Sequence, residues 1–333
     1  MAAMAKDGAE NLAKRVLAGE RRALARAITL IESGRDDHRA GALALLKAVN
    51  RADRQALRIG LSGAPGVGKS TFIDAFGMML AGLGLKVAVL AVDPSSARSG
   101  GSILGDKTRM DRLSRQPAAF IRPSPSQSHL GGVARRTREA VALCEAAGHD
   151  VVLIETVGVG QSETMAAELC DIFVLLIAPA GGDELQGVKR GIMEIADLIL
   201  VNKADGDLKA AAARTCADYA GALRLMRKRA EDADGFPKAL AISALEESGL
   251  QTAWAEMSAL AEWRRRSGHW AARRARQARY WFGEEVRHGL LLRLSRDAAL
   301  DGMMQSLGDA VLEGRESPSV AAAHLLERFD GGG

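Results

Sequence analysis

The chain has 333 residues, enough for one large domain or two smaller ones with a buried core. Hydrophobic residues make up 47% of the chain and charged residues 26%, which is ordinary for a soluble globular protein and argues against extensive disorder. Aromatic residues reach only 4%, which argues against a surface that stacks the bases of single-stranded nucleic acid. The net charge of +4 is small for this length and indicates no particular partner.

The cysteine pattern predicts a reducing compartment. The cysteines, Cys144, Cys170 and Cys216, are odd in number and far apart, so they form neither a disulfide framework nor a short CxxC motif. The longest apolar stretch, Ile172–Ala180, is too short to cross a bilayer, and the first residues show no signal-peptide core. We therefore expect a cytoplasmic protein that does not enter a membrane.

Residues 1–56 are expected to form an N-terminal helical region. Apolar residues recur there at helical spacing: Leu24, Ile28 and Ile31. Gly34 marks the expected end of that helix, and Asp36 or Asp37 is expected to cap the next one.

Residues 57–247 show short apolar runs alternating with helical segments. The predicted strands are Leu57–Leu61, Val87–Val92, Val151–Ile154, Ile172–Ile177, Leu198–Val201 and Ala239–Ile242. The predicted helices between them include Phe72–Leu83, Val133–Ala147 and Leu208–Ala230. This alternation predicts an α/β fold with a mostly parallel sheet covered on both faces. Ligands of such sheets bind at the carboxyl ends of the strands.

A phosphate-binding loop follows the first predicted strand. Its residues are Gly63, Ala64, Pro65, Gly66, Val67, Gly68, Lys69, Ser70 and Thr71. The glycines let the backbone wrap around phosphates, and the next helix adds its positive N-terminal end. Lys69 is predicted to reach the β- and γ-phosphates, and the Ser70 hydroxyl to ligate Mg²⁺. A strand before the motif and a helix after it argue against a chance match.

A guanine-reading motif follows the fifth predicted strand, at Asn202, Lys203 and Asp205. The Asp205 carboxylate can accept hydrogen bonds from the ring N–H and the exocyclic amine of guanine, whereas adenine would leave it unpaired. Lys203 can lie along the base, and Asn202 can brace neighbouring loops. The alternative is a surface turn, which the position at a strand end disfavours. After the sixth predicted strand, a backbone N–H is expected to reach the guanine oxygen from Ser243, Ala244 and Leu245.

Acidic residues near the phosphate-binding loop are candidate metal ligands. Glu155 ends an apolar strand, where a carboxylate suits Mg²⁺. Asp93 follows another strand and is expected to have a catalytic or metal role, with turn formation as the alternative. Asp106, in a glycine-rich loop, is expected to be a metal or switch residue. Gly158 can offer its N–H to the γ-phosphate.

The residue that orients the attacking water is not evident. Val159 follows Gly158, where many regulatory GTPases have a glutamine, so Gln161 and Asp93 are the nearest candidates. Lys69 completes the predicted catalytic set. We expect slow intrinsic hydrolysis, on the order of 10⁻⁴–10⁻² s⁻¹.

Four motifs together resemble the MeaB/ArgK family of P-loop GTPases: Gly63–Thr71, Val92–Ser96, Glu155–Glu163 and Val201–Asp205. The resemblance extends over nearly the whole chain. It implies a homodimeric chaperone of methylmalonyl-CoA mutase, or of a related adenosylcobalamin-dependent mutase. Such a protein would bind GTP, GDP and Mg²⁺, gate adenosylcobalamin loading, protect or rescue the mutase, and hydrolyse GTP faster when the mutase is bound.

The resemblance also implies roles for particular residues. The Mg²⁺ site would comprise Ser70, Asp93, Asp106 and Glu155. An extra switch that responds to the mutase would lie in residues 181–190 and would include Asp183, Gln186 and Lys189. Its glycines and opposite charges suit a mobile, partner-facing segment, and the alternative is an ordinary connection.

Residues 248–333 are expected to be a C-terminal helical dimerisation arm. This segment contains every tryptophan of the chain, interleaved with arginines, and these two residue types are enriched at interaction hot spots. The alternatives are packing on the GTPase domain and nucleic-acid binding, and the near-neutral balance of the segment disfavours the second.

Two other functions stay open from sequence. A GTP-dependent protein phosphotransferase is disfavoured because the chain has no kinase-type H-R-D set. A metal-delivery GTPase is disfavoured because the six histidines are dispersed.

Overall fold

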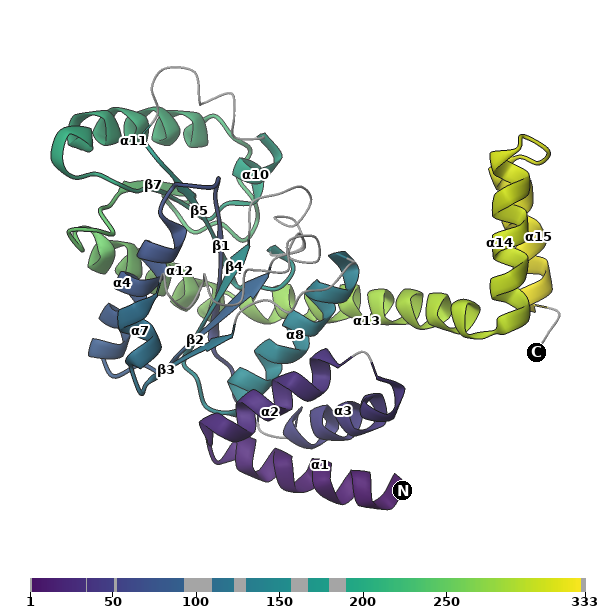
Figure 1. Cartoon of the computed structure of the whole chain (residues 1–333). Coiled ribbons are helices and arrows are strands. Elements are labelled where there is room, and N and C mark those ends of the chain that lie inside the picture. The colour runs from purple at the N-terminus through teal and green to yellow at the C-terminus, as the bar shows by residue number, and fades with distance from the viewer. Residues whose placement is uncertain are drawn as a thin grey trace. The chain divides into compact units, whose positions relative to one another are not determined.

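The computed structural model describes residues 2–33, 35–50, 53–92, 110–122, 130–156, 167–179 and 190–330. The chain divides into two compact units, Met1–Ala275 and Arg276–Gly333. Figure 1 shows the elements of both units. The first contains a parallel sheet with helices around it, and the second contains helices only over its described residues.

The described residues of the first unit form a seven-stranded sheet in the order β3-β2-β4-β1-β5-β6-β7. Its strands are β1 (Leu57–Ser62), β2 (Val87–Val92), β3 (Ala119–Arg122), β4 (Val151–Thr156), β5 (Ile172–Ile177), β6 (Leu198–Val201) and β7 (Lys238–Ala241). All the pairings are parallel, which confirms the α/β fold and the parallel sheet. The carboxyl ends of the strands therefore share one edge of the sheet.

Strand β3 was not among the predicted strands. It has only four residues, Ala-Phe-Ile-Arg, between Pro117 and Pro123, and so gives little periodic signal. All six predicted strands are confirmed, each within two residues at either end.

The sheet is covered by helices on its faces. They include α4 (Lys69–Gly82), α7 (Asp111–Arg115), α8 (Leu130–Ala146), α10 (Arg190–Ile195), α11 (Lys209–Arg224) and α12 (Leu250–Arg266), with the short 3₁₀ helix η3 (Gly206–Leu208) before α11. Helix α11 ends at Arg224, so the prediction that it continues to Ala230 is wrong. After Arg224, the Arg229 guanidinium binds Asp232 and the carbonyl of Ile195, and these bonds hold the chain in a non-helical path.

The main core lies between the sheet and helices α4 and α12. Alternate strand residues such as Ile59, Val89 and Leu153 belong to it, together with Phe72 and Phe76 of α4. Burial of such side chains typically stabilises a fold by about 1.5–3 kcal/mol each. The core therefore fixes α4, and with it the loop that precedes α4.

The N-terminal helices are α1 (Ala2–Leu17), α2 (Arg21–Glu32) and α3 (Asp36–Val49). The predicted apolar face of α2 is confirmed, since its Leu24, Ile28 and Ile31 are buried. The predicted cap of α3 is wrong, because the helix already begins at Asp36. The Asp37 carboxylate accepts hydrogen bonds from the Arg35 guanidinium at 3.0 and 2.6 Å, and this ion pair occupies the group that was expected to cap. Gly34 lies outside the described residues.

The C-terminal helices are α12, α13 (His269–Arg296), α14 (Ala298–Leu312) and α15 (Pro318–Asp330), so the helical content predicted there is confirmed. Several residues proposed as interface anchors pack within the first unit instead. Trp270 belongs to its main core, and Trp254 and Trp263 pack against that core. The guanidinium groups of Arg265 and Arg274 lie over the Trp270 ring.

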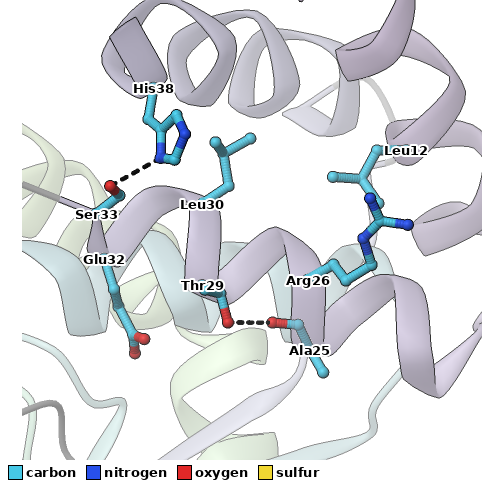
Figure 2. A pocket seen from close by; sticks show the side chains of 8 residues that line it. All are labelled: Leu12, Ala25, Arg26, Thr29, Leu30, Glu32, Ser33 and His38. Carbon is cyan, nitrogen blue, oxygen red and sulfur yellow. Dashed lines mark hydrogen bonds between the residues drawn. The ribbon is translucent and has the colours of Figure 1, made fainter. Parts of the chain in front are cut away.

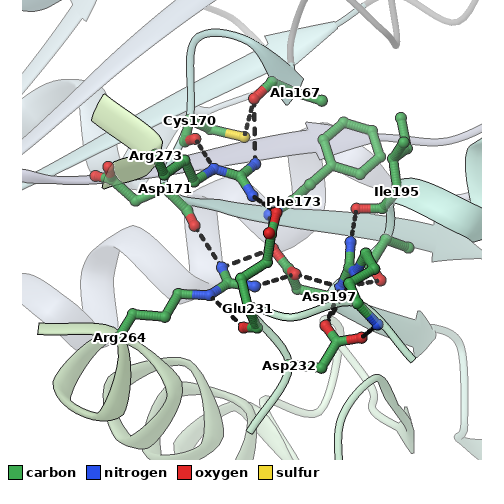
Figure 3. A network of polar contacts seen from close by, with 12 residues as sticks. Ala167, Cys170, Asp171, Phe173, Ile195, Asp197, Glu231, Asp232, Arg264 and Arg273 are labelled. Carbon is green, nitrogen blue, oxygen red and sulfur yellow. Dashed lines mark hydrogen bonds and ion pairs between the residues drawn. The ribbon is translucent and has the colours of Figure 1, made fainter. Parts of the chain in front are cut away.

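A buried ionic network joins α12 to the strands of the sheet (Figure 3). Asp197, just before β6, is fully buried and accepts hydrogen bonds from Arg264 at 2.6 Å and from Arg229 at 2.7 Å. It also accepts from the Phe173 N–H at 2.8 Å. Burial alone would raise the pKa of Asp197, but the two guanidinium groups hold that pKa at about 2.

We expect Asp197→Asn to lower the free energy of unfolding by about 3–5 kcal/mol, because it leaves the buried Arg264 guanidinium without its carboxylate. The measurement is urea unfolding at pH 7, with Asp218→Asn as the control because Asp218 is exposed on α11. Since the folded pKa of Asp197 lies below its usual value of 3.8, its contribution is complete above that value and falls as the pH drops towards 2. Equal stability of the two variants would contradict this assignment.

Candidate nucleotide site

The phosphate-binding loop connects β1 to α4 at the carboxyl edge of the sheet. A Cβ atom at Gly63 would lie 2.3 Å from the Leu176 carbonyl oxygen, so only glycine fits there. Gly68 has φ +91°, and a Cβ atom there would lie 2.6 Å from Asn202 Nδ2. The two glycines therefore let the loop lie directly against β5 and against the loop after β6.

Lys69 and Ser70 begin α4, so both side chains start at the positive end of that helix. Lys69 Nζ donates hydrogen bonds to the carbonyl oxygens of Gly63 at 2.6 Å and Ala64 at 3.1 Å, across the loop. Burial lowers the pKa of Lys69, and the nearby Glu155 carboxylate opposes that shift. The ammonium group is thus held over the concave backbone where phosphates are expected to bind.

Glu155 lies near the end of β4 and is 6% exposed. In the sheet register it is opposite Leu61 of β1 on one side and Ala91 of β2 on the other, so it lies beside the strand that carries the phosphate-binding loop. A carboxylate and the Ser70 hydroxyl are oxygen ligands of the kind that Mg²⁺ prefers, so these two residues fit the predicted metal.

Other predicted site residues lie outside the described part of the chain. They are Asp93, Asp106, Gly158, Gln161, Asp183, Gln186 and Lys189. Their roles in metal binding, catalysis and partner response stay predictions.

Asn202 joins the two halves of the site. It is 2% exposed, its Nδ2 donates to the Val67 carbonyl at 2.9 Å, and its Oδ1 accepts from the Ala244 N–H at 3.0 Å. One side chain therefore ties the phosphate-binding loop to the loop after β7. The structure thus gives Asn202 the bracing contacts that the sequence analysis anticipated.

Asp205 lies beside Ser243, and the Ser243 hydroxyl donates a hydrogen bond to Asp205 Oδ2. The same hydroxyl accepts from the Glu246 N–H at 3.0 Å, and Ser243 N donates to the Ser248 carbonyl at 3.0 Å. These bonds shape the loop 243–248 around the carboxylate. They leave Asp205 half-buried, with its other oxygen available to a ligand donor.

The backbone between these residues is also constrained. Lys203 has φ +58°, and the Ala204 N–H donates to the Ile242 carbonyl at 2.9 Å. Leu245 is exposed at the tip of the neighbouring loop. The arrangement provides a phosphate-binding loop and a carboxylate that can read a base, both at one edge of the sheet.

A separate hollow lies among the N-terminal helices (Figure 2). It has a volume of about 620 Å³, and its lining includes Arg26, Glu32 and His38. His38 Nδ1 lies 2.8 Å from Ser33 Oγ. Its lining residues all belong to α1–α3 or the segment between α2 and α3, so this hollow is distinct from the nucleotide site.

Comparison with known protein families identifies the family of the chain. The family model described as methylmalonyl-CoA mutase-associated GTPase MeaB matches residues 24–299. The chain belongs to the MeaB family. Together with the phosphate-binding loop and the fold, this membership makes the protein a P-loop GTPase, an enzyme that hydrolyses GTP.

Similar proteins support the same conclusion over nearly the full length. A GTPase of Caulobacter vibrioides is 51% identical over 96% of this chain and 97% of its own. The mitochondrial methylmalonic aciduria type A homolog of Mus musculus is 47% identical over 93% of this chain and 77% of its own. A solved structure, described as LAO/AO transport system kinase, superposes with a TM-score of 0.75 at 38% identity, covering 97% of each chain.

Some residues near this MeaB-family site were not found from sequence. Asp74 of α4 is buried and accepts hydrogen bonds from the Leu113 N–H and from Arg112. An acidic residue within the otherwise apolar stretch Phe72–Phe76 was a signal that could have marked it. Arg112 gave no such signal, because it is one of many exposed arginines in the chain.

Proposed function

We propose that this MeaB-family GTPase is a chaperone of methylmalonyl-CoA mutase, gating the loading of adenosylcobalamin and protecting or rescuing the mutase. The observation that supports this most is the match of residues 24–299 to a family described as mutase-associated. The similarity to a methylmalonic aciduria type A homolog points the same way. A cytoplasmic location is part of the proposal, and no described helix is long and apolar enough to span a membrane.

In the proposed mechanism, backbone N–H groups of the phosphate-binding loop hold the phosphates and Lys69 balances charge on the β- and γ-phosphates. Asp205 accepts from guanine, and Asn202 keeps the two loops at a fixed spacing. Ser70 and Glu155, with Asp93 and Asp106, would hold Mg²⁺, which when bound neutralises charge on the phosphates. Within the described part of the chain no group of three or more His, Cys, Asp or Glu side chains suits a metal, and Asp93 and Asp106 lie outside that part.

GTP is proposed to order the segments around Asp106, Gly158 and residues 181–190, with Asp183, Gln186 and Lys189 facing the mutase. Hydrolysis would release these segments and so change the surface that the mutase contacts. Val159 replaces the water-orienting glutamine of many regulatory GTPases, leaving Gln161 or Asp93 for that role. The mutase would then be needed to complete or order the catalytic groups.

We expect phosphate release from GTP by the purified protein at about 10⁻⁴–10⁻² s⁻¹, in the range of unassisted GTPases. Adding the mutase should raise this rate. Single-turnover assays with labelled GTP, with and without the mutase, measure both quantities. Turnover at tens per second without a partner would contradict slow intrinsic hydrolysis, and an unchanged rate across a full mutase titration would contradict stimulation.

Formation of the complex tests the partner itself. Size-exclusion chromatography of this protein with the mutase should show co-elution, with a different affinity in GDP and in a non-hydrolysable GTP analogue. An unrelated acyl-CoA enzyme that does not use adenosylcobalamin is the control partner. Absence of any complex in both nucleotide states would overturn the proposed function while leaving GTP hydrolysis intact.

We also propose that the protein is a homodimer joined through residues 276–333. In that unit Phe282 is 70%, Val286 46% and Leu290 43% exposed, and their spacing of four residues places them along one face of α13. Large apolar side chains exposed together on one small unit are typical of an interaction surface. Phe282→Asp with Leu290→Asp should halve the mass measured by light scattering, whereas Leu225→Asp, at an exposed position in the first unit, should not. A dimer that persists in the double variant would overturn this interface.

The phosphotransferase alternative has one supporting observation, the likeness to a structure described as a transport system kinase. Incubation with γ-labelled GTP and candidate acceptor proteins separates the two reactions. Our proposal predicts free phosphate as the labelled product, and label transferred to an acceptor protein would favour the alternative.

A further inference from the structure

Helix α7 is seated directly on α4, the helix that follows the phosphate-binding loop. Leu113 of α7 is fully buried against Gly77, where a Cβ atom would lie 2.5 Å from Leu113 Cδ2. The Leu113 N–H donates to Asp74 Oδ1 at 2.9 Å. Close packing and a buried hydrogen bond therefore fix the position of α7 relative to α4.

From this fixed helix, the Arg112 guanidinium reaches two other elements. Its Nε donates to Asp74 Oδ2 at 2.8 Å, and its Nη1 donates to Glu247 Oε1 at 2.6 Å. Both carboxylates raise the pKa of Arg112, the Asp74 bond more strongly. One side chain thus bridges α4 and the loop 243–248.

Glu247 occupies a constrained position in that loop. It has φ +56°, a conformation that is unfavourable for a residue with a side chain, and the loop closes through the bridge between Ser243 and Ser248. Near the start of the loop, Asn202 Oδ1 accepts a hydrogen bond from the Ala244 N–H. Near its end, Glu247 binds Arg112. Asn202 also binds the phosphate-binding loop, and Arg112 also binds α4, so both ends of the loop 243–248 are tied to the elements that form the phosphate site.

We infer that Arg112 is a positioning residue for guanine recognition, holding the loop 243–248 so that a backbone N–H at its tip, that of Leu245, meets the guanine O6. The inference rests on the proposed reading of guanine by this loop and by Asp205. Arg112 acts through Glu247 and Asp74 and touches no ligand itself.

The test compares GTP with 6-thio-GTP, which keeps both hydrogen-bond donors for Asp205 but replaces O6 with a weakly accepting sulfur. In calorimetric titrations of the full chain, Arg112→Ala should raise the Kd of GTP about three- to tenfold and that of 6-thio-GTP less than about twofold. Arg115→Ala is the matched control, because Arg115 lies on the same helix and pairs only locally with Asp111. It should leave both Kd values unchanged.

Glu247→Ala removes the other end of the bridge while leaving the Asp74 bonds to α7 in place, and it should reproduce the effect of Arg112→Ala even if the latter is poorly folded. The double variant should bind no more weakly than Arg112→Ala alone, because Arg112→Ala already removes the bond to Glu247. An unchanged GTP affinity in either variant, or equal loss for GTP and 6-thio-GTP, would overturn the role of Arg112. A wild-type protein with no preference for GTP over ATP would instead overturn the guanine-reading assignment on which it rests.

Discussion

Replacement of Lys69 with Ala is expected to lower kcat for GTP hydrolysis by about 10²–10³-fold, the usual cost of removing one preorganised donor to transition-state charge. The Lys69 ammonium group is bonded to the Gly63 and Ala64 carbonyl oxygens of the phosphate-binding loop, so we expect it to lie beside the phosphates on which charge develops. Burial lowers the pKa of Lys69, and the negative charge of Glu155 acts in the opposite direction and favours the charged ammonium form. Phosphate release under saturating GTP and Mg²⁺ measures the effect.

The matched control for this variant is Lys86→Ala, which removes the same charge at an exposed position before β2. It should retain the wild-type rate. The melting temperature of Lys69→Ala should stay near that of the wild type. The two carbonyl oxygens that lose the Lys69 ammonium group can accept hydrogen bonds from water instead. A rate for Lys69→Ala within threefold of wild type would contradict the role assigned to this residue.

Asp205→Asn is expected to reverse the base preference from GTP towards XTP. The carboxylate accepts two donors from guanine, and hydrogen bonds to a charged group contribute about 1.5–3 kcal/mol each, so the Kd of GTP should rise about 100-fold or more. The asparagine amide can instead donate to the C2 carbonyl of xanthine. Titrations with GTP and XTP measure the change in their affinity ratio.

Asp207→Asn serves as the control for that variant, since Asp207 is exposed only two residues away. It should keep the wild-type ratio of GTP to XTP affinity. The Ser243 hydroxyl bond to position 205 can persist with asparagine, so the loop should keep its shape. Retained GTP selectivity in Asp205→Asn would refute base reading by this residue.

Most strands and helices were predictable because each has a local pattern of apolar residues in the sequence. The strands Val87–Val92 and Ile172–Ile177 are uninterrupted apolar runs, and the structure gives them with the predicted bounds. Strand β3 was missed because four residues between prolines show no period. The end of α11 was missed because Arg229 stops the helix through tertiary bonds to Ile195 and Asp197, which no local pattern records.

The site was predictable where its chemistry resides in short motifs and not where it depends on distant contacts. Gly63 and Asn202 were found because their motifs need those residue types. The bridge of Arg112 to Asp74 and Glu247 was not found, since its ends lie 38 and 135 residues away from Arg112. Likewise, Trp270 was expected at an interface, because sequence alone does not show that its side chain is buried in the core of the first unit.

The central claim is that the carboxyl edge of this sheet holds a guanine nucleotide, and the direct measurement is a calorimetric titration of the wild-type protein with GTP and with ATP in the presence of Mg²⁺. A site whose carboxylate hydrogen-bonds the guanine edge should bind GTP about 10⁴-fold more tightly than ATP. Equal affinity for the two nucleotides would contradict the account.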